Sequence, residues 1–156
     1  MSGTDERQIL RRVGLRSTPQ RLAILREVFS RSHPTVAEIY ESVRSRFPTI
    51  GLQTVYNTLH TMTQRGIVTE LSFSSATRFD SNTKPHANLV CRNCGGIEDA
   101  EFASDHFEAM LRRVIQPTGF ARDGQRIDVY GLCMTCATSK SASPSACAGA
   151  TVTDSA

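Results

Sequence analysis

The segment IGLQTVYNTLHTMTQRG, residues 50–66, has two chemically distinct faces when it is drawn as a helix. Val55, Leu59 and Met62 recur at helical spacing and form an apolar stripe, and Gly66 is placed to end the helix. The opposite face carries short hydrogen-bonding side chains and no carboxylate: Gln53, Thr54, Asn57, His60 and Thr61. Such a face suits a helix laid against base edges and phosphates, so the segment predicts a DNA-recognition helix.

The segments on either side predict further short elements. Ser17-Thr18-Pro19 supplies a helix cap and a first-turn proline, and Thr35-x-x-Glu38 is a capping-box pattern before a second helix. Residues 67–80, IVTELSFSSATRFD, predict two strands around a Ser-Ser-Ala turn. Three compact helices followed by a β-hairpin describe a winged helix-turn-helix over residues 1–80; the alternative is a generic helical domain.

Charge is distributed unevenly along the chain. Residues 1–80 hold eleven arginines against seven acids, whereas residues 81–156 hold seven basic residues against eight acids. Within residues 7–31, seven arginines face one acid, Glu27. A solvated helix face would explain the arginines alone, but together with the polar helix they favour a polyanion-binding, DNA-binding surface.

Four cysteines form the pattern C-x2-C-x38-C-x2-C: Cys91, Cys94, Cys133 and Cys136. The N-terminus resembles no secretory signal and no apolar run is long enough to span a bilayer, so we expect a cytoplasmic protein without a membrane partner. Cysteines stay reduced there, and four thiolates suit one closed, structural Zn²⁺ site. The alternative is a pair of catalytic dithiols, which is disfavoured because neither pair precedes an obvious redox-active helix.

The residues between the two cysteine pairs predict a small α/β unit over residues 81–139. Residues 88–90, 96–102 and 126–132 are expected to be strands. A helical stripe, expected to pack in the core, is formed by Phe107, Met110, Leu111 and Val114. Residues 140–156 are small, polar and aperiodic, which predicts a disordered tail in which Cys147 is a bystander.

The remaining candidate ligands, His33, Asp80, His86 and Asp99, are spread across both halves of the chain. Spacing does not prove that they converge. If they do, their imidazoles and carboxylates describe a site for divalent iron or manganese, separate from the sulfur site. We expect His60 and the equally isolated His106 to be ordinary surface or core residues.

Six segments together resemble the ferric-uptake-regulator superfamily and, within it, the peroxide-responsive repressor branch. They are LRSTPQRLAIL, HPTVAEIY, TVYNTLHTMTQRGIV, RFD, HANLVCRNCGGIED and RIDVYGLCMTC, in order over residues 7–139. The resemblance implies an α+β protein in which a winged-helix N-terminal domain precedes an α/β dimerisation domain. It also implies a homodimer that represses transcription when metal is bound, not an enzyme.

The resemblance also implies roles for individual residues. The four cysteines match the structural zinc ligands, and His33, Asp80, His86, Asn88 and Asp99 match the regulatory Fe²⁺ or Mn²⁺ site, each with one ion per subunit. Iron-catalysed oxidation of His33 or His86 by hydrogen peroxide would release the metal and then the operator. The expected DNA contacts are Arg16, Gln20, Arg21, Gln53, Thr54, Tyr56, Asn57 and Arg78.

Two positions point to different signals. Asp80 is typical of peroxide sensors, whereas Asn88 stands where such sensors commonly have a second histidine. An amide oxygen is a harder and weaker ligand than imidazole, so Asn88 either weakens the site or does not ligate. The alternatives are a metal-homeostasis repressor of the same superfamily, insensitive to peroxide, and a thiol-based redox protein.

Overall fold

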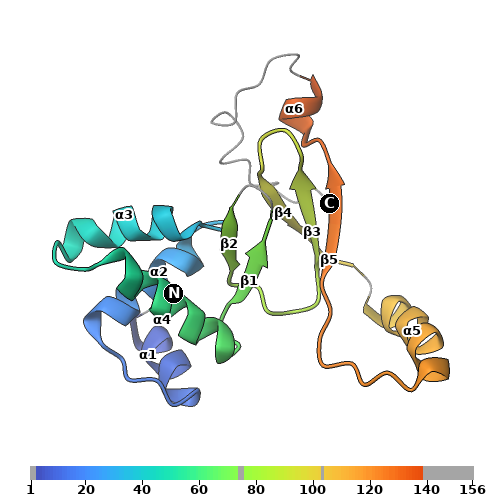
Figure 1. Ribbon diagram of the computed structural model, residues 1–156, viewed down its shortest axis with the longest axis horizontal. Coiled ribbons are helices and arrows are strands. Elements are labelled where there is room, and N and C mark those ends of the chain that lie inside the picture. Colours follow the sequence, from blue (N-terminus) through green and yellow to red (C-terminus); the bar gives the residue numbers. More distant parts are fainter. Residues whose placement is uncertain (1–2, 74–75, 103, 139–156) are drawn as a thin grey trace. The chain divides into compact units, whose positions relative to one another are not determined.

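The computed structural model describes residues 3–73, 76–102 and 104–138 (Figure 1). The chain separates into two compact units, residues 1–83 and a second unit from Lys84 onward. The predicted disordered tail, with Cys147, and the centre of the predicted Ser-Ser-Ala turn lie outside the described residues. In the described part, no helix is long and apolar enough to cross a membrane.

The first unit begins with a helix that the sequence analysis did not predict, α1 (Gly3–Arg12). Leu10 on this helix is fully buried in the core. Glu6 is also buried, and its carboxylate accepts a 2.6 Å hydrogen bond from Arg26 Nε on the next helix. A buried carboxylate paired with an arginine in this way fixes α1 against its neighbour.

The next three helices begin and end where local sequence signals place them. Thr18 caps α2 (Pro19–Ser30), and Thr35 with Glu38 forms the predicted capping box of α3 (Val36–Arg46). The third, α4 (Leu52–Gln64), is followed by Gly66, whose φ of 67° is in the left-handed region that glycine tolerates.

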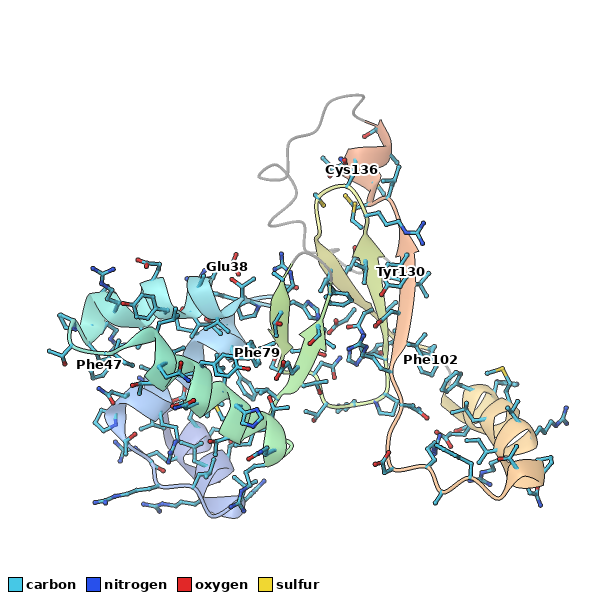
Figure 2. All side chains as sticks on the ribbon, in the orientation of Figure 1. Glu38, Phe47, Phe79, Phe102, Tyr130 and Cys136 are labelled. Carbon is cyan, nitrogen blue, oxygen red and sulfur yellow. The ribbon has the colours of Figure 1, made fainter. Side chains whose placement is uncertain are left out.

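A β-hairpin completes the first unit, with β1 (Thr69–Ser72) antiparallel to β2 (Thr77–Asp80). Phe79 on β2 is buried among the helices (Figure 2). It shares one apolar core with α2, α3 and α4, including Ile24, Val55 and Leu59. The predicted winged helix is therefore present, with α1 added to it.

The second unit is built on a three-stranded sheet in the order β4-β3-β5 (Figure 1). The strands are β3 (Ala87–Cys91), β4 (Ile97–Ala100) and β5 (Ile127–Gly131). β3 pairs antiparallel with β4 and parallel with β5. The connection to β5 contains α5 (Ser104–Ile115) and a 3-10 turn (Gln116–Thr118), and α6 (Met134–Thr138) follows β5. This agrees with the predicted α+β fold class.

The predicted apolar stripe lies on α5, but the expectation that it packs in a core is wrong for two of its members. Met110 and Val114 are 51% and 64% exposed, whereas Phe107 and Leu111 are half-buried. Helical periodicity shows that a stripe forms one face but not what covers that face.

Candidate metal centres and recognition helix

Two turns of the second unit bring the four predicted cysteines into one cluster. Cys91 ends β3 and Cys94 lies in the following turn, while Cys133 and Cys136 lie at the start of α6 and within it. Their four sulfur atoms all lie within 4.8 Å of one another. Sulfurs held about 2.3 Å from a tetrahedral zinc ion are about 3.8 Å apart. The spacing therefore fits a four-thiolate metal site.

Backbone amides around the cluster favour thiolates over thiols. The amide of Cys133 donates to Cys91 Sγ at 3.3 Å, and the amide of Gly96 donates to Cys94 Sγ at 3.4 Å. Burial opposes ionisation of Cys91, but amides of Cys94, Cys133 and Asn93 outweigh it and lower the pKa of Cys91 to about 6. Thiolate is the form that binds zinc, so the donor set fits that metal.

The turn that carries Cys94 depends on two glycines. Gly95 has a φ of 69°, which favours glycine. A Cβ on Gly96 would approach Cys94 Sγ to 3.3 Å, which is a tight contact. The small residues after the first cysteine pair thus allow the chain to fold closely around the sulfur atoms.

The positions of the four sulfur atoms argue against the alternative of two catalytic dithiols. None of these four cysteines is in a disulfide bond, and Cys94 Sγ lies 3.9 Å from Cys133 Sγ in the other pair. The second pair does adjoin a helix, because the five-residue α6 begins at Met134, between Cys133 and Cys136. However, the sulfurs gather across the two pairs, which is the arrangement of a shared metal ion.

In the first unit, His33 and Asp80 are both buried and lie close together. His33 Nε2 is 3.8 Å from Asp80 Oδ1, and the two side chains are 3% and 4% exposed. The other ring nitrogen, Nδ1, is 3.0 Å from the hydroxyl of Ser32. Two atoms bound to one ion at about 2.0–2.2 Å are at most about 4.4 Å apart, so this pair can share a metal.

The backbone that presents His33 is strained and anchored. His33 has a φ of 48°, a left-handed conformation that is uncommon for residues other than glycine. Arg78 Nη1 on β2 donates to the His33 carbonyl at 3.0 Å, and the amide of Phe79 donates to Pro34. The loop that holds His33 is therefore tied to the hairpin.

In the second unit, His86 and Asp99 repeat the arrangement of the first pair. His86 Nε2 is 3.6 Å from Asp99 Oδ1, and Nδ1 is 2.7 Å from the carbonyl of Lys84. Since a carbonyl only accepts, Nδ1 carries a proton, and in the neutral ring Nε2 then has the lone pair. That tautomer is the one in which Nε2 can bind a metal.

Asn88 belongs to the same sheet as Asp99 and is only 2% exposed. It is directly opposite Asp99 in the β3–β4 register. Its Nδ2 donates to the Ile127 carbonyl at 3.3 Å and to Asp128 Oδ1 at 3.1 Å. Asn88 is thus held rigidly on the face of the sheet that Asp99 occupies.

The predicted recognition helix is α4, and its polar face is exposed. Gln53, Thr54, Tyr56 and Asn57 are all accessible, whereas Val55, Leu59 and Met62 are buried. Gln53 Nε2 donates to Asn57 Oδ1 at 2.8 Å, and the Tyr56 ring stacks on His60. Side chains prearranged in this way present donors and acceptors to a partner.

The other predicted DNA contacts differ in their surroundings. Arg16 is exposed, Gln20 and Arg21 are half-buried at the start of α2, and Arg21 Nη1 donates to the Arg16 carbonyl at 2.7 Å. Arg78 is half-buried, and its guanidinium holds the His33 loop. His60 and His106, the two histidines that were not expected to bind metal, are both exposed.

The residues that orient the candidate ligands were not predicted from the sequence. Ser32 holds the His33 ring and Asp128 holds the Asn88 amide. Ser32 is adjacent to a candidate ligand, which is a usable signal. Asp128 is 40 positions from Asn88, and only the parallel register of β3 with β5 brings the two together.

The winged-helix unit and the four-cysteine unit together define a class of metal-containing DNA-binding regulators. A family model described as "Ferric uptake regulator family" matches residues 12–130. The chain belongs to this family, and the superfamily resemblance seen in its sequence is confirmed.

Individual relatives agree with this family. The chain is 41% identical over 130 residues to a peroxide-responsive repressor of Staphylococcus epidermidis, covering 81% of this chain and 85% of the relative. It is 39% identical over 132 residues to the peroxide operon regulator of Bacillus subtilis, covering 83% and 89%. The Campylobacter jejuni peroxide stress regulator has a similar structure, with a TM-score of 0.67, 30% identity and coverage of 83% and 97%.

Proposed function

We propose that the protein is a metal-dependent transcriptional repressor, not an enzyme, that binds operator DNA as a homodimer in the cytoplasm and senses hydrogen peroxide. The observation that carries this proposal is the matched geometry of two ligand pairs. In each pair, an imidazole is held at Nδ1 and its Nε2 lies within 4 Å of a carboxylate oxygen. The similarity to peroxide-responsive repressors supports the same function.

The regulatory ion is proposed to be Fe²⁺ or Mn²⁺, one per subunit, bound by both ligand pairs together. Each pair offers one imidazole and one carboxylate, and Asn88 offers an amide oxygen. A single pair cannot fill the coordination shell of such an ion, whereas two pairs with Asn88 supply five donors. Zinc is proposed at the four cysteines, also one per subunit, as a structural ion.

Metal binding by donors from both units would couple the metal to DNA. Arg78 and Phe79 join the His33 loop to β2 by hydrogen bonds, so a movement of His33 on binding metal would also move the hairpin. Two recognition helices in a dimer must match successive major grooves. If the metal favours the matching geometry, metal and operator each tighten the binding of the other.

The homodimer is supported by surfaces of the second unit that one chain leaves uncovered. β5 is at the edge of the sheet, and Val129 and Leu132 at this edge are 50% and 58% exposed. Met110 and Val114 on α5 are exposed as well. An exposed edge strand and apolar side chains together suit pairing with a second copy.

Peroxide sensing is proposed to act on the two ligand histidines. Ferrous iron held by these ligands would promote the reaction of hydrogen peroxide with a ligand ring, in which one oxygen atom is added to the ring and the other leaves as water. His33 Nε2 and His86 Nε2 each lie within 4 Å of a carboxylate that would share the ion, so both rings would be exposed to an oxidant formed there. An oxidised ring is a poorer ligand, and its loss would lower the affinity for metal and therefore for DNA.

The test compares iron-loaded and manganese-loaded protein after a brief, low dose of hydrogen peroxide. We expect one added oxygen on the peptide with His33 or His86, only with iron. Binding to a duplex selected by the protein from a random pool should be lost at the same time. Unmodified histidines with intact DNA binding would instead support a metal-homeostasis repressor, the candidate that Asn88 favours.

A further inference from the structure

Three polar side chains form a row across one face of the sheet in the second unit. In the strand registers, Asn88 on the central strand is opposite Asp99 on β4 and Asp128 on β5. Directly opposed residues place their side chains on the same face of a sheet. The row therefore joins one proposed metal ligand, Asp99, to a residue with no assigned role, Asp128.

The orientation of the Asn88 amide is determined by its neighbours. Nδ2 faces two acceptors, the Ile127 carbonyl at 3.3 Å and Asp128 Oδ1 at 3.1 Å. The reversed amide would place its oxygen against the same two acceptors, which would be repulsive. Asp128 and the backbone thus fix which end of the amide points away from β5.

The oxygen of the same amide has no hydrogen-bond partner among the described residues. Asn88 Oδ1 is buried, and the residue is 2% exposed. Leaving a buried acceptor unsatisfied costs about 1–3 kcal/mol. An oriented and unsatisfied oxygen opposite Asp99 is the arrangement expected of a ligand to a hard cation.

Asp128 is itself poorly suited to bind the ion. Its Oδ1 accepts from Asn88, and its Oδ2 accepts from Arg126 Nε at 3.0 Å and Nη2 at 2.8 Å. Both carboxylate oxygens are therefore engaged. The arginine also offsets the charge, which leaves Asp128 as a hydrogen-bond acceptor.

We propose that Asp128 is a positioning residue for the regulatory metal site. It holds Asn88 so that Oδ1, and not Nδ2, is presented as a ligand to a hard divalent cation such as Mn²⁺. This inference rests on the proposed function, because it assigns a residue to the same site.

The test measures Mn²⁺ affinity of the zinc-loaded, full-length protein from the electron paramagnetic resonance signal of free Mn²⁺. Asn88→Ala should weaken binding about 10-fold. Asp128→Leu, which removes the acceptor, should weaken it several-fold. Asp128→Asn keeps an acceptor without the charge and should bind nearly as well as the original chain.

The double variant separates positioning from a general charge effect. In the Asn88→Ala background, Asp128→Leu should cause no further loss of Mn²⁺ affinity, because the amide that it orients is absent. Equal additional loss in that background, or full affinity of Asp128→Leu alone, would overturn the proposal while leaving the proposed function intact. Full affinity of Asn88→Ala would also overturn it.

Zinc content is the folding control for each variant. If Asp128→Leu fails to retain zinc, Asp128→Ala replaces it with the same expected loss. An original chain that binds no Mn²⁺ at all would refute the proposed function itself, and the positioning role with it. Failure of the inference alone is thus distinguishable from failure of the function on which it rests.

Discussion

The four-cysteine cluster and the two His–Asp pairs differ in how the chain places candidate metal ligands. The cysteines lie in one compact unit, with their sulfurs already within 4.8 Å of one another. His33 and Asp80 lie in the first unit, whereas His86 and Asp99 lie in the second. A site complete within one unit stabilises that unit, whereas ligands divided between units make metal binding depend on their arrangement. The first design suits a permanent ion and the second suits a signal.

The largest expected effect comes from removing one cysteine of the proposed structural zinc site. Cys133→Ser should abolish zinc binding and unfold the second unit, because structural zinc contributes about 10–16 kcal/mol of apparent binding free energy. Metal analysis and thermal unfolding by circular dichroism measure this. Cys147→Ser is the control and should keep its zinc. Full zinc content in Cys133→Ser would contradict a structural role.

Removing a ligand of the proposed His–Asp site should instead leave the second unit folded and its zinc bound. His86→Ala should lower Mn²⁺ affinity by at least about 100-fold and abolish metal-dependent operator binding, while zinc stays bound. The matched control is His106→Ala, because His106 is exposed on α5. Titration with Mn²⁺ and gel-shift assays measure the outcome. Simultaneous loss of zinc would show that the two centres are not independent.

A smaller effect is expected from the hydroxyl that orients a ligand. Ser32 Oγ lies 3.0 Å from His33 Nδ1, so Ser32→Ala should lower Mn²⁺ affinity about 10-fold by loosening the ring. Ser30→Ala is the control, because the Ser30 hydroxyl donates to the Glu27 carbonyl instead. Equal Mn²⁺ affinities for the two variants would argue against an oriented His33.

The smallest effect concerns the helix cap beside the His33 loop. Thr35→Ala should reduce the free energy of unfolding by about 1 kcal/mol, measured with urea, and leave zinc in place. Loss of zinc from Thr35→Ala would show that a helix cap in the first unit affects the cysteine site of the second unit.

Thr35→Ala should also change how the free energy of unfolding depends on pH in acid. Burial acts to raise the pKa of Glu38, but hydrogen bonds from Thr35 outweigh it and hold that pKa below its ordinary value of 4.5. The stabilisation is complete above pH 4.5 and disappears as the pH falls through the lower folded value. Alanine keeps the backbone amide that donates to Glu38 at 2.7 Å and removes only the hydroxyl, so Thr35→Ala should flatten the acid dependence of stability in part. An unchanged pH profile would argue against a contribution from the Thr35 hydroxyl.

The sequence predicted those features that depend on local chemistry. Thr18, the Thr35–Glu38 capping box and Gly66 were identified because caps and turns act over a few residues. The first helix was missed, since its burial depends on a contact between Glu6 and Arg26 across 20 positions. The exposure of Met110 and Val114 was also missed, because a stripe does not reveal its partner.

The candidate sites follow the same division. Cysteine spacing was sufficient to predict the sulfur cluster, because two Cys-x2-Cys pairs are the usual sequence pattern of a four-thiolate zinc site. Asp128 was out of reach, because its contact with Asn88 exists only through the register of two parallel strands. The convergence of the four His and Asp ligands on one ion remains a prediction, which His86→Ala tests.

The parallel pairing of β3 with β5 also sets the order in which the chain can fold. The first cysteine pair is synthesised well before the second, with 38 residues between them. Non-local strand pairing is slow because the intervening loop must close first. The first unit contains no cysteine, so it can fold while the second unit is still open. If the cysteines bind zinc as proposed, its capture would mark the completion of the second unit, and a chelator added during refolding should trap a species in which only the winged-helix unit is native.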